Sequence, residues 1–239
     1  VQVAADHPVD RRARCAVKYL SLILLAGCLG DIDPEWQLDH TRIIAVRATP
    51  PHIPAGATSQ LDLLTATKGA TTAELAPDAT IVVSPMSLAG ALSGSTVTAP
   101  SEDRLAAART ELGLMPGAPV PLQLQVASGS LAATKTVWLG DAVDNPVLAN
   151  VLIGGAAAPA AGEMVTVPPD TDVHMSIDAD DTLMFVSWLT SCGTMHDFDL
   201  HAAYIHVLPD DPQTGELAVI LRDPRSGGVT WEVWPIAAQ

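Results

Sequence analysis

Two carboxylates and an imidazole recur at alternate positions in the segment Met195-His196-Asp197-Phe198-Asp199-Leu200-His201. Side chains two residues apart share one face of an extended strand, so a strand here would bring Asp197, Asp199 and His201 together. Carboxylate oxygens and imidazole nitrogens bind zinc and other transition metals. This set is the candidate metal site, and a hydrolase reaction, the most distant alternative, would use the same residues. We favour the competing interpretation, a chance grouping of polar residues in a loop.

A second acidic group offers a calcium alternative in the turns of the same half. Its members are Asp170, Asp172, Asp178, Asp180 and Asp181. Calcium takes about six to eight oxygen ligands, commonly from one loop with a glycine at fixed spacing. The spacing here matches no such loop, so we interpret these acids as solvated turn residues and keep calcium-dependent ligand binding as an alternative function.

Motifs for catalysis are missing from the sequence. It contains no G-x-S-x-G, H-E-x-x-H, P-loop or G-x-G-x-x-G pattern, and its aromatic content of 4% leaves little for carbohydrate stacking. Cys192 is the one cysteine after Cys28, so an intrachain disulfide framework is excluded there. We expect Cys192 to be a small buried hydrophobe. The sequence thus predicts no catalytic residue, no cofactor and no enzymatic activity.

The stretch from Val17 to Cys28, VKYLSLILLAGC, has the features of a secretory signal. Arginines and a lysine precede an apolar run over residues 19–26, as in the charged and apolar regions of signal peptides. That run is much shorter than the roughly 20 residues that span a bilayer. We therefore expect a helical signal segment over residues 1–28, in which the hydrophilic residues 1–16 are an extension if translation begins at Val17.

The end of this stretch, Leu25-Ala26-Gly27-Cys28, resembles the lipobox of bacterial lipoproteins. The resemblance implies that the small residues admit the signal peptidase and that the Cys28 thiol takes a diacylglycerol, which anchors the mature chain in the membrane. Leu29 stands where an aspartate would favour retention at the inner membrane. The resemblance therefore implies a lipid-anchored protein of the cell envelope, at the outer membrane.

The charge of the chain excludes nucleic-acid binding. Four of its 12 Lys and Arg and two of its 27 Asp and Glu precede Cys28, which leaves 8 basic against 25 acidic residues and a formal charge of −17 after it. Phosphate contacts need clustered Lys and Arg. Anionic headgroups also repel such a surface, so the acyl chains on Cys28 are the expected membrane attachment.

After an acidic tether over residues 29–40, short β-rich runs alternate with Pro and Gly breaks. We expect strands at 42–48, 59–66, 80–84, 120–127, 132–139, 163–169, 173–179, 183–190, 216–223 and 229–235, with a further apolar run at 147–153. One helix is expected over residues 101–112, with Ser101 as its cap and Gly113 as its end. This spacing predicts antiparallel β-sandwiches and not βαβ units.

Polar and turn-forming residues around Asn145-Pro146 divide the chain into halves of about 100 residues each, the size of an immunoglobulin-like module. In the second half a Trp-bearing strand, a further strand, an acidic glycine-containing turn and a closing strand resemble PKD and bacterial Ig-like modules over Asn145 to Ile236. The expected fold is all-β, with two tandem Ig-like sandwiches at 41–144 and 145–239 and one short helix in the first.

These expectations favour an exported, lipid-anchored surface protein that acts as a binding or structural module. Its partners would be the membrane, through the acyl chains, and an envelope or extracellular protein or polysaccharide. Metal- or calcium-dependent ligand binding through the acidic turns is the alternative function.

Overall fold

The structure, a computed structural model, describes residues 34–75, 79–179 and 183–239. Residues Glu35–Gln239 form one compact unit. The predicted signal segment and its lipidation residue, Cys28, lie outside the described residues. Within the described ranges, no helix has both the length and the apolarity needed to cross a membrane.

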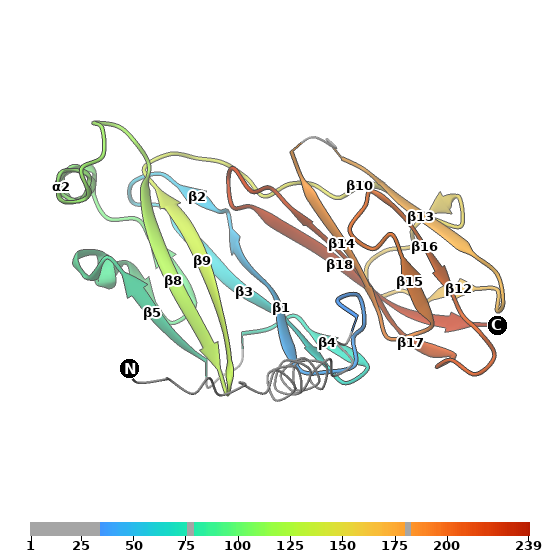
Figure 1. Cartoon of the computed structure of the whole chain (residues 1–239). Coiled ribbons are helices and arrows are strands. Elements are labelled where there is room, and N and C mark those ends of the chain that lie inside the picture. The colour runs from blue at the N-terminus through green and yellow to red at the C-terminus, as the bar shows by residue number, and fades with distance from the viewer. Residues whose placement is uncertain (1–33, 76–78, 180–182) are drawn as a thin grey trace, which may run out of the picture. The chain divides into compact units, whose positions relative to one another are not determined.

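The first half of the compact unit folds into two sheets (Figure 1). Its strands are β1 (Arg42–Thr49), β2 (His52–Ile53), β3 (Thr58–Thr67), β4 (Ala70–Thr72), β5 (Thr80–Ser84), β6 (Leu92–Ser93), β7 (Thr96–Thr98), β8 (Val120–Ser128) and β9 (Leu131–Leu139). One sheet has the order β1-β3-β7-β6, with β4 added on β3, and the other has the order β2-β9-β8-β5. We call this pair of sheets the first sandwich.

The second half repeats this plan. Its strands are β10 (Ala149–Ile153), β11 (Ala156–Ala157), β12 (Val165–Val167), β13 (Val173–Asp178), β14 (Phe185–Thr190), β15 (Thr194–His196), β16 (Ala202–His206), β17 (Thr214–Arg222) and β18 (Val229–Ala238). One sheet has the order β11-β10-β13-β16-β15 and the other the order β12-β18-β17-β14. This is the second sandwich, and residues 140–148 join it to the first.

Both sandwiches have the strand order of an immunoglobulin-like fold. If the principal strands are lettered in chain order, β1, β3, β7 and β6 form an A-B-E-D sheet, and β9, β8 and β5 form a G-F-C sheet. The second sandwich gives the same letters. In each, a short extra strand, β2 or β12, pairs in parallel with the last strand. The predicted all-β fold with two Ig-like sandwiches is confirmed.

The strand patterns follow from which faces are covered. Along β8, Val120, Leu122, Leu124 and Val126 are buried and the residues between them are more exposed, because one face of this sheet is open. In β17, by contrast, every residue from Leu217 to Leu221 is buried. Alternate side chains of β17 point to the core of the second sandwich and to the first sandwich, so both faces of this strand are covered.

The predicted helix is α2 (Glu102–Leu112), and it packs on the first sandwich. Gly113 ends it in a left-handed conformation at φ 67°, as expected, whereas Ser101 precedes it without a side-chain capping bond. Leu105 is buried in this core, whereas Leu112, the last residue of the helix, is 39% exposed. A 3-10 turn, η1 (Met86–Ala91), also contributes to this core and was not predicted.

The end of the predicted tether is folded, so for residues 35–40 the expectation of a tether was wrong. Gln37 forms a parallel bridge with Thr190, the Leu38 amide donates to the Thr190 carbonyl over 2.9 Å, and the Thr190 amide donates to the Trp36 carbonyl over 2.9 Å. Leu38 is fully buried. The acidic residues of the segment favoured the prediction of a tether, but burial of its apolar side chains stabilises the segment against the second sandwich.

Candidate functional site

The predicted metal ligands lie in a turn and are not assembled. Asp197 has a φ of 54°, and the Leu200 amide donates to its carbonyl over 3.0 Å, which closes a turn between β15 and β16. The extended strand that would have aligned Asp197, Asp199 and His201 is therefore interrupted. Among the described residues, no group of three or more His, Cys, Asp or Glu could hold a metal ion. The ligand set that the metal and hydrolase alternatives required is not brought together.

Two acids of the calcium alternative are engaged by a histidine. Nδ1 of His206 lies 2.6 Å from Oδ1 of Asp172, and its Nε2 lies 3.4 Å from Oδ1 of Asp170. The hydrogen bond with Asp172 raises the pKa of His206, against a smaller lowering by burial, and Asp170 adds to the rise. The remaining acids are Asp178, at the end of β13, and Asp180 and Asp181, outside the described ranges.

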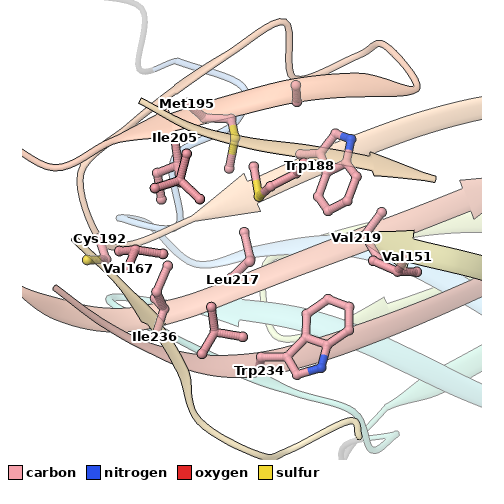
Figure 2. Packing of buried hydrophobic residues seen from close by; sticks show 14 of the residues in the cluster. Val151, Val167, Trp188, Cys192, Met195, Ile205, Leu217, Val219, Trp234 and Ile236 are labelled. Atoms are coloured by element: carbon pink, nitrogen blue, oxygen red, sulfur yellow. The ribbon is translucent and has the colours of Figure 1, made fainter. Parts of the chain in front are cut away.

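Cys192 is a buried core residue, as expected. It is a free thiol with no exposed surface, packed in the core of the second sandwich (Figure 2). Burial, together with the nearby charge of Asp211, raises its pKa to about 11. Since the thiolate is the reactive form, the environment of Cys192 opposes nucleophilic chemistry.

The more informative region is the junction between the two sandwiches. An apolar cluster crosses it, with contributions from the segment before β1, from both sandwiches and from the closing strand β18. Its buried members are Leu38, Ala45, Leu64, Ala66, Leu189, Ala218, Ile220, Val229 and Trp231. We call this set the junction cluster. It makes the junction a third apolar core, beside those inside each sandwich.

Residues of the joining segment bind both sandwiches at the edge of this cluster. Nδ2 of Asn145 donates to the Ala48 carbonyl over 2.8 Å, and its Oδ1 accepts from the Val229 amide over 2.9 Å. His52, which is 7% exposed, has Nδ1 at 2.9 Å from Asp141 Oδ1 and Nε2 at 3.0 Å from the Ser226 carbonyl. The position we interpreted only as a boundary is therefore a point of attachment.

Further polar contacts cross the junction directly. The Thr71 amide donates to a Glu216 carboxylate oxygen over 2.6 Å, and the Ser191 hydroxyl donates to the Gly69 carbonyl over 3.0 Å. The Arg47 guanidinium lies 3.9 Å from the centre of a Trp231 ring, a cation–π geometry. Polar contacts therefore join the two sandwiches at several points beside the junction cluster.

A cleft of about 370 Å³ opens beside the junction, between β1, β9 and the β17–β18 hairpin. Its wall contains two cations, Lys135 from the first sandwich and Arg222 from the second. The Lys135 ammonium donates to the Gly227 carbonyl, and Nη2 of Arg222 donates to the Ile44 carbonyl over 3.0 Å. Burial lowers the pKa of Lys135 to about 8 and also lowers the pKa of Arg222.

The hairpin turn that forms one side of the cleft, at residues 223–228, is the acidic glycine-containing turn predicted before the closing strand. Burial alone would raise the pKa of Asp223, but hydrogen bonds from the Ser226 hydroxyl and from Arg225 lower it below its usual value. The Asp223 carboxylate is therefore committed to its own loop. Sequence reasoning missed the cleft, although the unbroken apolar run in β17 was a signal that a second face is covered.

No protein-family model matches the chain, and no curated protein matches it. Among solved structures, the titin domains Z1Z2 in complex with telethonin are 11% identical, with 84% of this chain and 98% of that chain covered and a TM-score of 0.25.

Two further solved structures are similar to the same extent. Three N-terminal domains of the Hoc capsid protein of bacteriophage RB49 are 13% identical, with 83% and 59% covered and a TM-score of 0.28. Drosophila N-cadherin EC1-4 is 12% identical, with 84% and 51% covered and a TM-score of 0.27. The assignment of the fold rests on the strand order of this chain itself.

Proposed function

We propose that this protein is an exported, lipid-anchored module of the cell envelope in which two Ig-like sandwiches are held in one fixed geometry, so that it acts as a structural or binding element and not as an enzyme. The junction cluster is the observation that carries this proposal. Tandem modules with small polar contacts move relative to one another by default. A buried apolar core between them removes that freedom.

The contacts at the border support the same conclusion. The side-chain amide of Asn145 forms hydrogen bonds with both sandwiches. Lys135 and Arg222, the two cations of the cleft, each donate to a backbone carbonyl of the opposite sandwich. Each of these bonds breaks if the sandwiches rotate apart, at a net cost of about 0.5–1.5 kcal/mol each, because water then replaces the lost partner. Rotation is therefore opposed by polar as well as apolar terms.

The proposed anchor is close to the folded unit. With lipid on Cys28 and packing from Glu35 onward, six residues separate them. A chain of six residues spans at most about 20 Å when fully extended. The first folded residues then lie near the bilayer surface, and they include Leu38 of the junction cluster, so the tether attaches at the junction. A fixed tandem attached there suits the display or spacing of a binding surface.

The fixed geometry is tested by backbone ¹⁵N relaxation of the full soluble part. We expect amides of both sandwiches to report one rotational correlation time. Trp231→Asp, which places a charge in the junction cluster, should split it into two shorter values. Two correlation times in the unmodified protein would contradict the proposal.

The anchor is tested separately by labelling with an alkyne fatty acid in a bacterial host. We expect label on the unmodified protein, none on Cys28→Ala, and full label on the matched variant Cys15→Ala. Loss of the acyl chain should also release the protein from the membrane fraction. A labelled or still membrane-bound Cys28→Ala protein would overturn the lipoprotein assignment.

A further inference from the structure

The cleft beside the junction contains an unusual pairing of charges. The chain has only 12 Lys and Arg and a formal charge of −15, yet two of its cations line one cleft. Among the described residues, no carboxylate lies within ion-pair distance of either Lys135 or Arg222. Burying a cation without a carboxylate is unfavourable. The arrangement leaves positive charge available to a ligand.

Lys135 and Arg222 each have more N–H donors than the hydrogen bonds found for them use. Nη1 of Arg222 donates to the Ser187 hydroxyl over 2.9 Å and Nη2 to the Ile44 carbonyl, which uses two of the five guanidinium N–H groups. The one bond found for the Lys135 ammonium goes to the Gly227 carbonyl and uses one of its three N–H groups. These carbonyl bonds hold the side chains in place, and the remaining donors fit an oxyanion.

An aromatic ring completes the cleft. Phe185 pairs with Arg222 in the β14–β17 register and lines the cleft, but 64% of its surface is exposed. Ile43 and Val229 add further apolar surface at the opposite strands. A volume of about 370 Å³ lies in the range of small-molecule sites. The wall therefore combines positive charge with apolar surface, and its one carboxylate, Asp223, is bonded within its own loop.

We propose that this cleft binds an organic oxyanion, a carboxylate or a phosphate ester carried on an apolar group. Lys135 and Arg222 contact the oxyanion, and Phe185 contacts the apolar group. The proposal rests on the fixed junction, because the two sandwiches supply one cation each. It goes further by giving the module a ligand class.

Binding is tested by calorimetry on the full soluble part, with benzoate, phenyl phosphate and inorganic phosphate as probes at constant ionic strength. We expect saturable binding of benzoate and phenyl phosphate and weaker binding of inorganic phosphate. Lys135→Met and Arg222→Gln should each weaken binding about tenfold or more, through loss of a charge-assisted hydrogen bond. Lys68→Met, which removes an exposed lysine, is the matched control and should bind as the unmodified protein does.

A purely structural role for the two cations predicts a different result. Both variants would then lower the melting temperature but leave the response to benzoate unchanged. That outcome, or no saturable binding of any probe, overturns the proposal even if relaxation shows a single correlation time. Because the pKa of Lys135 is about 8, binding should also weaken between pH 7 and pH 9, and this dependence should vanish in Lys135→Met.

Discussion

The two sandwiches share one strand order and differ in what fills them. The core of the first consists of aliphatic side chains and alanines, with Leu122 and Leu124 among its fully buried members. The second encloses two tryptophans, Trp188 and Trp234, both with no exposed surface (Figure 2). The same topology is thus reached with different side chains. Alternation along strands and the order of pairing determine the fold, and the core residues determine how much each sandwich contributes to stability.

Trp188 is in the position where the difference is greatest. It lies on β14, the C strand of the second sandwich, where many Ig-like domains also carry a buried tryptophan. The corresponding strand of the first sandwich, β5, buries only Val83. The Trp188 indole donates to the Leu200 carbonyl over 3.1 Å, so this side chain also holds the turn that follows β15.

The largest predicted effect is the loss of that indole. Trp188→Ala should lower the free energy of unfolding by about 3–5 kcal/mol, from lost burial and the cavity that remains. Urea unfolding of the full soluble part measures it. Phe185→Ala, on the same strand but exposed, should change stability by about 0.5 kcal/mol or less. Equal effects of the two variants would show that the tryptophan core is not the stabilising feature we infer.

A smaller loss of stability is expected from a substitution in the junction cluster, which belongs to both sandwiches. Leu38→Ala should cost about 2–4 kcal/mol, because Leu38 is as fully buried as the core leucines. It should also separate the unfolding of the two sandwiches into two transitions, since it loosens the core that joins them. Leu122→Ala, within the first sandwich, is the matched control and should leave one transition.

Loop glycines give a third contrast between the sandwiches. Gly193 in the second has a φ of 70°, and a Cβ there would lie 2.4 Å from the His206 carbonyl oxygen. Gly56 in the first has a φ of 79° with nothing within 4 Å. Both alanine variants pay about 1–2 kcal/mol for the left-handed conformation, and Gly193→Ala should cost roughly 2 kcal/mol more for displacing backbone. Chemical denaturation at one pH compares them, and equal midpoints would contradict the close approach.

The success of the sequence in predicting the fold has a physical reason. Strands such as β8 and β17 are long and strongly apolar on at least one face, so their pattern alone indicates them. Short strands such as β6 and β7, with two and three residues, carry too few side chains to give a pattern and form because their neighbours supply pairing partners. Residues with weak patterns take their structure from the sheet around them.

The cleft beside the junction could not be predicted from the sequence, because it depends on contacts between residues that are far apart in the chain. Lys135 and Gly227 are 92 residues apart, and nothing local indicates that they meet. The burial of Leu38 was not predicted, because the residues around it in the sequence are acidic, although its apolar side chain is fully buried. At Asp197 the error was local, because an assumed strand is in fact a turn with one left-handed residue. Residue spacing predicts which side chains share a face only where the segment has the secondary structure that was assumed.

The smallest predicted effect distinguishes the exposed charge group of the second sandwich from an ion pair of the first, in which the arginine is buried and the glutamate is exposed. In the first, Arg109, 4% exposed, pairs with Glu102 at 2.5 Å. In the second, Asp172 and Asp170 raise the pKa of His206. A raised pKa means that the folded state binds the proton more tightly, so this contribution is present below the ordinary histidine pKa of about 6.5 and is lost as pH rises through the folded value.

The difference in urea midpoint between the unmodified protein and His206→Gln should therefore be larger at pH 6 than at pH 9. Asp172→Asn removes the main cause of the raised His206 pKa, so in that background the effect of His206→Gln on the urea midpoint should differ less between pH 6 and pH 9. In the background of Glu102→Gln, in the first sandwich, the pH dependence of this effect should be unchanged. A difference that stays constant or grows with pH would mean that His206 gains nothing from its carboxylates. Because these groups face water, we expect this effect to be smaller than any of the three above.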